Sequence, residues 1–210
     1  MTSHERREQL IAVARTLFAE KGFEGASIEE IASRAEVSKP VVYEHFGGKE
    51  GLYAVVVDRE VMALLAAIRG ALDAATGQRD MMERATVALL DYVESNTDGF
   101  RILSRDSHVG ATSGSFASIL SDVASQVEDI LISQFKRRRL DPKSAPIYAQ
   151  MLVGMVALTG QWWLDNPKMK KNVVAAHLVN LAWHGMENLQ PNPHLQILDK
   201  PRKQRGRDKS

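Results

Sequence analysis

The sequence predicts an all-α protein in which a compact helix-turn-helix unit near the N-terminus precedes a larger helical domain. Apolar residues recur at helical spacing through most of the chain. No stretch shows the strict alternation of apolar and polar residues that is typical of a half-buried strand. Two short helical patterns are separated only by a turn at 36–38, as in a helix-turn-helix motif. These observations predict about nine to ten helices and no sheet.

Length and composition allow one large domain or two small ones. The chain has 210 residues, of which 44% are hydrophobic, so a substantial core can form. Cysteine is absent, which excludes disulfides and thiolate metal ligands and fits a cytoplasmic protein. The first ten residues are polar and charged, so we expect no signal peptide. No apolar run approaches the roughly 18 residues of a membrane span, so we expect no membrane partner.

The net charge of +1 hides an uneven distribution. Residues 200–210 hold six lysines and arginines and one acid, which leaves 21 basic and 25 acidic residues elsewhere, a net of −4. Residues 1–60 hold eight basic and eleven acidic side chains. The composition therefore does not predict a broadly basic surface for nucleic acid. Contact with DNA has to come from a few well-placed cations and from helix N-termini.

Local signals define the first two helices. Residues 5–21 have the apolar spacing of a helix, which Gly22 is expected to end in a left-handed conformation. Phe23 is then expected to fold back on the helix end. Ser27 opens the second helix, and Glu30, three residues later, completes a capping box.

A short third helix is predicted at about 39–46. Ser38 can cap it, and Pro40 is tolerated in its first turn because that position needs no N–H within the helix. Gly47 and Gly48 end it.

Longer amphipathic patterns fill the rest of the chain. A fourth helix begins at Lys49, and further helices are predicted at 61–75, 79–95, 99–107, 113–138, 144–164 and 168–189. Prolines at 142 and 167 separate the last three, and prolines at 191 and 193 end regular structure. The tail beyond Asp199 has the composition of a disordered segment.

The third helix carries side chains suited to reading DNA in the major groove. Hydroxyl groups and free N–H groups at helix starts can meet phosphate oxygens. Lysine can donate to guanine, apolar groups can touch thymine methyls, and glutamate can accept from cytosine. The predicted DNA-binding residues are Ser27, Ser38, Lys39, Pro40, Val41, Tyr43, Glu44, His45 and Lys49. The pattern alone leaves a simple helical bundle as an alternative.

Two segments, LIAVARTLFAEKGFEGAS at 10–27 and SIEEIASRAEVSKPVVYEHFGGKEGLY at 27–53, resemble the DNA-binding domain of TetR-type (tetracycline-repressor-like) transcriptional regulators. The most recognisable part is 43–46 with the following glycines. The resemblance implies base reading by 39–44 and a core position for Leu52. It implies phosphate contacts from Ser27, Lys39, Tyr43, His45 and Lys49.

The composition predicts a basic tail at 191–210. The same resemblance implies a helix-turn-helix DNA-binding domain at 1–58 and a helical ligand-binding and dimerisation domain at 59–190. It implies a homodimer paired through the last two large helices and a double-stranded DNA operator that is palindromic. We therefore expect a repressor released from its operator by a small, largely apolar effector. The alternative is a ligand-independent dimeric DNA-binding protein whose second domain only dimerises or binds proteins.

Two further sets of residues follow from this expectation. Glycine inside a helix costs about 1 kcal/mol relative to alanine, so glycines in 144–164 favour close approach to another helix. The predicted dimer-interface residues are Gly154, Ala157, Gly160, Leu178, Leu181 and Trp183, with packing inside one chain as the alternative. Aromatic and thioether groups suit an adaptable apolar cavity. The predicted ligand-binding residues are Tyr92, Phe100, Leu103, His108, Phe116, Met151, Met155 and Trp162, with ordinary core packing as the alternative.

Other chemistries have no support in the sequence. His177 and His184 are seven positions apart, which is not the spacing of a chelating pair on a helix, so we expect no metal site. Nucleophile–base motifs, phosphate loops and dinucleotide fingerprints are missing, so we expect neither a cofactor nor an enzyme. The basic run 136–139 ends a helix, where cations interact favourably with the helix dipole and can bond the last carbonyls.

Overall fold

The computed structural model describes residues 1–105, 116–195 and 197 of the chain. The described residues form nine α-helices, one short 3₁₀ helix and no strand, which confirms the all-α prediction. The elements are α1 (Ser3–Gly25), α2 (Ile28–Arg34), α3 (Lys39–Phe46), α4 (Lys49–Asp73), α5 (Gln78–Ser95), α6 (Thr97–Arg105), α7 (Phe116–Arg138), η1 (Pro142–Ser144), α8 (Ala145–Asp165) and α9 (Lys171–Glu187). The predicted disordered tail lies outside the described residues.

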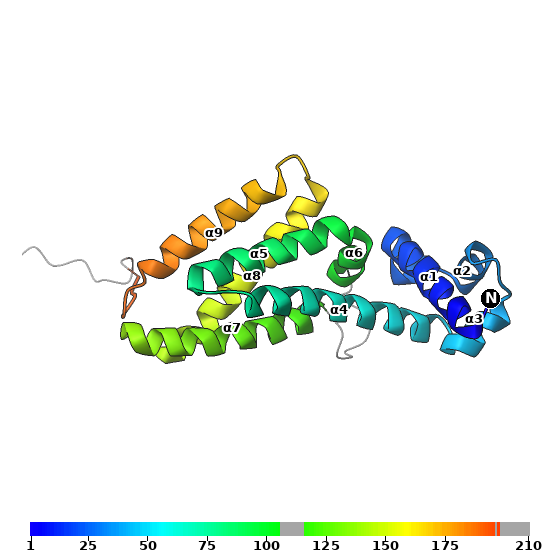
Figure 1. Ribbon diagram of the computed structural model, residues 1–210, viewed down its shortest axis with the longest axis horizontal. Helices are drawn as coiled ribbons and strands as arrows, with labels where there is room; N and C mark the ends of the chain where they lie inside the picture. The colour runs from blue at the N-terminus through cyan, green and yellow to red at the C-terminus, as the bar shows by residue number, and fades with distance from the viewer. Residues whose placement is uncertain (106–115, 196, 198–210) are drawn as a thin grey trace, which may run out of the picture.

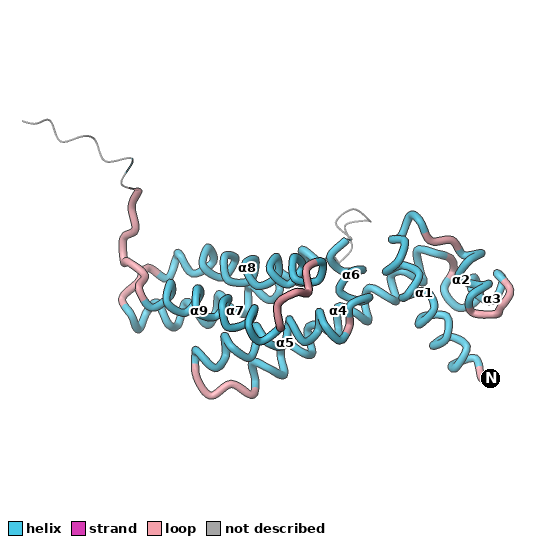
Figure 2. Tube along the Cα trace, turned by 90° about the horizontal axis from the view of Figure 1, so that it is seen from above, coloured by secondary structure: helices cyan, strands magenta, loops and turns pink. Residues whose placement is uncertain are grey.

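The molecule is elongated, with α1, α2 and α3 gathered at one end (Figure 1). We call these three helices, with the start of α4, the head. Helix α4 continues from the head into a bundle formed with α5, α7, α8 and α9, which we call the body (Figure 2). Helix α6 packs against both α1 and α4, so it links head and body. The main apolar core is continuous, because buried residues from Leu10 in α1 to Leu178 in α9 belong to one cluster.

Gly22 interrupts α1 in the way the sequence predicts. Its φ of +72° is a left-handed conformation, and the helical turn that follows extends to Gly25. The reversal brings Phe23 back against the helix. Its ring lies 6.3 Å from that of Phe18 and 4.9 Å from that of Tyr53 on α4. This aromatic cluster fixes the end of α1 against α4.

Two capping predictions are partly wrong. The Ser27 side chain does accept a hydrogen bond from the Glu30 N–H, at 3.2 Å. However, the Glu30 carboxylate binds the side chains of Lys21 and Arg34 instead of completing the capping box. Ser38 stands at the start of α3, yet its hydroxyl makes no capping hydrogen bond. Lys21 and Arg34 compete for the Glu30 carboxylate. The first turn of α3, after Ser38, contains Pro40.

The prediction of separate helices beginning at Lys49 and at 61–75 is wrong, since one helix spans Lys49–Asp73. The polar sequence Asp58-Arg59-Glu60 looks like a break in the apolar pattern, but it contains neither glycine nor proline to end a helix. Glu60 is only 7% exposed and is buried by contacts from other helices. The expected boundary at 58/59 therefore falls inside a continuous helix.

The remaining helices differ from their predicted bounds by a few residues, as is common at helix ends. Helix α9 begins at Lys171 rather than 168 because the Trp163 indole donates to the Met169 carbonyl at 2.8 Å, which orders the connection before it. No helix within the described part of the chain is long and apolar enough to cross a membrane.

Candidate DNA-binding surface and apolar cavity

The turn between α2 and α3 is closed by backbone hydrogen bonds. Val37 N–H donates to the Ala32 carbonyl at 2.9 Å, and Glu36 N–H donates to the Ser33 carbonyl at 3.1 Å. Glu36 has a φ of +53° and takes the left-handed position that glycine usually occupies in this motif. The turn therefore sets the angle between the two helices without a glycine, which the sequence pattern did not reveal.

Helix α3 turns one side to the core and the other to solvent. Val42 is fully buried, and Val41 and Phe46 pack partly against the core. The exposed residues are Ser38, Lys39, Pro40, Tyr43 and Glu44. Tyr43 is 54% exposed although it is a large aromatic residue. All five were predicted from the sequence to contact DNA, and together they form one accessible face of α3.

The two predicted lysines have different environments. Lys39 is exposed and pairs with the Glu29 carboxylate, whose pKa is lowered chiefly by this hydrogen bond. Lys49 is half-buried. Its ammonium group donates to the carbonyls of Phe23 at 3.0 Å and Ala26 at 3.2 Å, and lies 4.2 Å from the centre of the Phe23 ring. Lys49 therefore holds the α1–α2 connection, and Lys39 is the more accessible of the two, although a phosphate would have to displace Glu29 from it.

The other predicted residues, Ser27 and His45, are half-buried. The His45 carbonyl accepts a hydrogen bond from Arg7 at 3.3 Å, and the Arg7 guanidinium lies 4.5 Å from the Phe46 ring centre. Arg7 thus connects α1 to the end of α3. Sequence reasoning missed it because the two residues are 38 positions apart.

Gly51 is a second missed residue. A Cβ atom at this position would lie 1.9 Å from the Phe46 carbonyl oxygen. The end of α3 therefore approaches the first turn of α4 more closely than any side chain allows. Gly51 fixes how α3 is presented at the surface.

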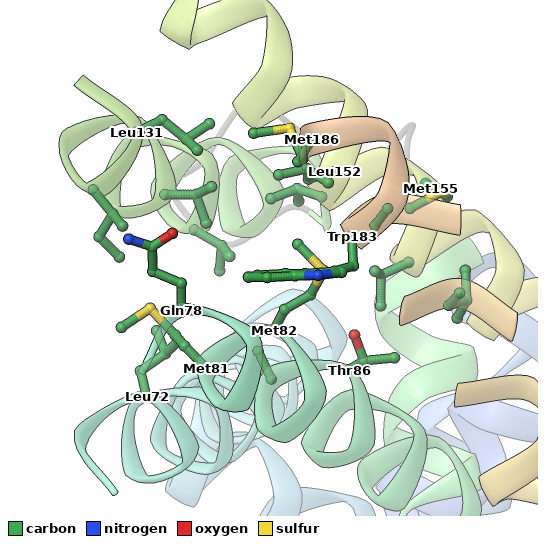
Figure 3. A pocket seen from close by; sticks show the side chains of 18 of the residues that line it. Leu72, Gln78, Met81, Met82, Thr86, Leu131, Leu152, Met155, Trp183 and Met186 are labelled. Atoms are coloured by element: carbon green, nitrogen blue, oxygen red, sulfur yellow. The ribbon is translucent and has the colours of Figure 1, made fainter. Parts of the chain in front are cut away.

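The body contains a partly open cavity of about 650 Å³ lined by α4, α5, α7, α8 and α9. Most of its wall is apolar, with Leu64 and Ile68 from α4 and Leu89 from α5. Figure 3 shows the Trp183 ring extending across the cavity beside Met82, with Met186 and Leu152 on the opposite side. A cavity of this size and character suits a small organic molecule.

Polar side chains of the cavity lie mostly at the end far from the head. They come from the start of α5 and from the ends of α7 and α9: Gln78, Gln134, Arg138, Glu187 and Asn188. Arg138 donates to the carbonyls of Met186 at 2.6 Å and Glu187 at 2.8 Å. It therefore does bond the last carbonyls of a helix, but those of α9 rather than of its own helix.

The predicted ligand-binding residues are divided among several places. Met155 lines the cavity. Tyr92, Phe100 and Leu103 are buried outside it, while Met151 and Trp162 are exposed on the outer side of α8. His108 lies outside the described residues, as does the side chain of Phe116 at the start of α7. Met81 and Met82 on α5 line the cavity, and these two adjacent methionines were the sequence signal that could have identified this helix as part of its wall.

The predicted dimer residues also divide. Leu181 is exposed, and a Cβ added to Gly154 would meet nothing within 4 Å, so both lie on the outside. Ala157, Leu178 and Trp183 line the cavity instead. Gly160 is buried against α5, where an added Cβ would touch Val93, Leu89 and Leu90. The outer stripe of α8 is nevertheless apolar and contains Ile147, Met151, Leu158 and Trp162.

Comparisons with known proteins agree with both parts of the structure. Residues 10–56 match the family model for bacterial regulatory proteins of the tetR family, and residues 78–185 match that for a tetracyclin repressor-like C-terminal domain. The transcriptional activator FasR of Mycolicibacterium smegmatis is 31% identical over 187 residues, covering 88% of this chain and 84% of the relative.

Solved structures show the same fold. A TetR-like transcriptional regulator from Rhodococcus sp. RHA1 superposes with a TM-score of 0.75 at 26% identity, covering 88% of this chain and 97% of the other. The ketosteroid transcriptional regulator KstR2 of Mycobacterium tuberculosis, at 18% identity and a TM-score of 0.68, shares the fold over 86% of this chain and 94% of its own. The chain therefore belongs to the tetR family of bacterial regulatory proteins and is a DNA-binding transcriptional regulator.

Proposed function

We propose that this chain is a homodimeric repressor that leaves a palindromic operator when a small, largely apolar molecule fills the cavity of its body. The observation that carries this proposal is the cavity of about 650 Å³ with an apolar wall, because the wall includes α4, the helix that continues into the head. A second domain that served only for dimerisation would need no such space. The alternative of a ligand-independent regulator is therefore less well supported.

The effector class follows from the wall. Apolar side chains make up most of it, and the polar groups lie mostly at the end remote from the head. We infer a ligand with an apolar body and at most a few polar atoms, which lie near Gln134 and Arg138. Two proteins of the same fold are named for ketosteroids and for fatty acid degradation, and both ketosteroids and fatty acids are largely apolar.

The dimer is proposed from the outer faces of α8 and α9. Leu158 and Leu181 are both more than 60% exposed, and Met151, Trp162 and Val173 are exposed near them in sequence. Exposed apolar stripes of this kind commonly mark protein interfaces. A two-fold pair would present two copies of α3 at about 34–36 Å, which is one turn of DNA.

Sequencing of DNA retained by the purified protein tests the proposed operator. Sheared genomic DNA of the source organism is incubated with the protein at physiological salt, and the bound fragments are sequenced. We expect a shared palindromic motif upstream of a small set of genes. Transcription from such a promoter in vitro should fall when the protein is added. A rise instead would show activation, as in the name of the relative FasR.

Filling the cavity should mimic the effector. Val127→Trp adds bulk to a residue that lines the cavity on α7, whereas Ser125→Trp places the same side chain on the exposed side of that helix. We expect Val127→Trp to weaken operator binding by about tenfold, within the usual range of coupling between sites, and Ser125→Trp to leave it unchanged. Fluorescence anisotropy with labelled operator DNA measures the affinity of both variants. Equal affinities for both variants would count against a ligand-gated mechanism.

Lysine substitutions should separate phosphate contact from support of the head. Lys39→Ala is expected to lower the salt dependence of operator binding by about two units in a dimer, one for each lost phosphate contact, without changing the melting temperature. Lys49→Ala removes two hydrogen bonds to backbone carbonyls, so we expect it to lower the melting temperature as well. Affinities at several salt concentrations, with circular dichroism melts, provide the measurement. An unchanged salt slope for Lys39→Ala would remove that residue from the DNA contacts.

A further inference from the structure

A group of polar side chains, in which Glu60 and Tyr92 are buried and Arg15 is half-buried, connects the head to the body. Arg15 lies on α1, Glu60 on α4 and Tyr92 on α5. Arg15 Nε donates to Glu60 Oε1 at 2.5 Å, and the Tyr92 hydroxyl donates to Glu60 Oε2 at 2.7 Å. The same hydroxyl lies 3.2 Å from the Glu60 backbone carbonyl. One carboxylate therefore joins three helices, and only Arg15 among these residues belongs to the head.

Helix α6 packs against the Glu60 carboxylate and limits the space around it. A Cβ atom at Gly99 would lie 1.8 Å from Glu60 Oε2 and 2.9 Å from the Tyr92 hydroxyl. The neighbouring Asp98 carboxylate lies 4.0 Å from a terminal nitrogen of Arg15. Glycine at position 99 is thus required for α6 to pack this closely. The Glu60 carboxylate has little freedom to move unless these helices move.

Two of the three side chains, Tyr92 and Arg15, each keep one protonation state. Burial is the largest cause that raises the pKa of Tyr92, and the hydrogen bond to Glu60 and its charge raise it further, so the phenol stays protonated and donates. Burial acts to lower the pKa of Arg15, but the hydrogen bond and charge of Glu60 outweigh it and leave that pKa raised. The Tyr92 hydroxyl therefore remains a hydrogen-bond donor and Arg15 remains charged at ordinary pH.

An ion pair whose carboxylate is buried is a poor means of stabilisation, because apolar residues of similar volume often serve as well or better. What it supplies is geometry, since short charged hydrogen bonds accept few arrangements. A matched pair lies between the same two helices nearer the N-terminus, where Arg59 and Glu8 form a salt bridge at the surface. Because both side chains of that pair are well exposed, we expect its loss to have little effect, whereas the Glu60 side chain is only 10% exposed.

The group also stands at the end of the cavity that faces the head. Leu64 on α4 and Leu89 on α5 both line the cavity. Leu64 is four residues beyond Glu60, and Tyr92 is three residues beyond Leu89, so each polar residue shares a helix face with a wall residue. A change in the separation of α4 and α5 inside the cavity therefore changes the separation of Glu60 and Tyr92.

We propose that Arg15, Glu60 and Tyr92, held against Gly99, form the joint that sets the orientation of the head and transmits occupancy of the cavity to it. The proposal rests on the ligand-gated function proposed above. Glu60 and Tyr92 are positioning residues, because they act on DNA binding through Arg15 and α1 and touch neither DNA nor ligand. When α4 and α5 separate, the Tyr92 hydroxyl leaves the carboxylate, and the head loses its fixed orientation.

Tyr92→Phe is the principal test, because it removes one oxygen atom and keeps the packing of the ring. We expect about fivefold weaker operator binding with an unchanged salt slope, since no phosphate contact is lost. Glu8→Gln, which breaks the exposed pair between the same helices, should bind as the unchanged protein does. Glu60→Gln provides a second variant, and circular dichroism melts show that each is folded. Wild-type affinity for folded Tyr92→Phe and Glu60→Gln would overturn the proposal.

A double-mutant cycle then tests transmission. Val127→Trp is combined with Tyr92→Phe, and separately with Glu8→Gln. We expect the tenfold effect of Val127→Trp to persist with Glu8→Gln and to shrink below about threefold with Tyr92→Phe, because the joint is already broken. Effects of Val127→Trp and Tyr92→Phe that simply multiply would show that the joint transmits nothing. If Val127→Trp alone has no effect, the ligand-gated function fails, and the affinity of Tyr92→Phe still decides whether the joint positions the head.

Discussion

Replacing Leu158 and Leu181 with aspartate is expected to give a folded monomer that binds operator about a hundredfold more weakly, because two linked heads gain avidity of that order or more. Leu158 on α8 is 64% exposed and Leu181 on α9 is 66% exposed. Each replaces an apolar contact by a charge that would have to be desolvated in an apolar interface. A symmetric dimer contains each substitution twice, so the free-energy cost to the interface is doubled.

Sedimentation velocity at micromolar concentration and operator anisotropy measure the two expected changes. Met62→Asp is a matched control, since Met62 is 65% exposed on α4, away from α8 and α9. It should leave the dimer and the affinity unchanged. A monomeric unmodified protein, or a Leu158→Asp/Leu181→Asp variant that remains dimeric, would contradict an interface built from these two helices.

Gly51→Ala is expected to destabilise the head and to weaken operator binding more than about tenfold. The added methyl group would lie 1.9 Å from the Phe46 carbonyl oxygen, so the end of α3 must move away from α4. Overpacking of this kind costs about 1–3 kcal/mol, and here the oxygen belongs to the backbone, which cannot turn aside as a side chain can. The displacement changes the position of Tyr43 and the rest of the exposed face of α3.

Gly70→Ala on the same helix supplies the comparison. Gly70 is exposed, and a Cβ at that position meets nothing within 4 Å. Alanine favours a helix by about 1 kcal/mol over glycine, so this variant should melt at a higher temperature than the unchanged protein. Circular dichroism melts and operator affinity are recorded for both variants. If Gly51→Ala had the same melting temperature as Gly70→Ala, the added methyl group at position 51 would not destabilise the contact between α3 and α4.

Much of the head follows from the sequence because its signals are local. Gly22 and Gly47 have the left-handed conformations that their places at helix ends predict, and Ser27 caps α2. The predicted residues Ser38, Lys39, Pro40, Tyr43 and Glu44 are exposed, whereas Val41 and His45 are half-buried. Such signals depend on residues within a few positions of one another, so a single sequence contains them in full.

Positions in the body could not be inferred in the same way. Ala157, Gly160 and Leu178 have the composition of a helix–helix interface, yet they face the inside of the chain. Met151 and Trp162 have the composition of a ligand pocket, yet they face outwards. An apolar stripe on a helix predicts burial but does not identify the partner, because core, cavity and subunit interface require the same kind of side chain.

By itself the sequence determined the helical class, the helix-turn-helix of the head and the family. Tertiary structure alone decided that α4 runs unbroken from head to body, that five helices line one cavity, and that Glu60 is shared by Arg15 and Tyr92. These last residues are 45 and 32 positions from Glu60 along the chain. No local propensity specifies such contacts, since they arise only when separate helices pack and leave a buried carboxylate that must find its donors.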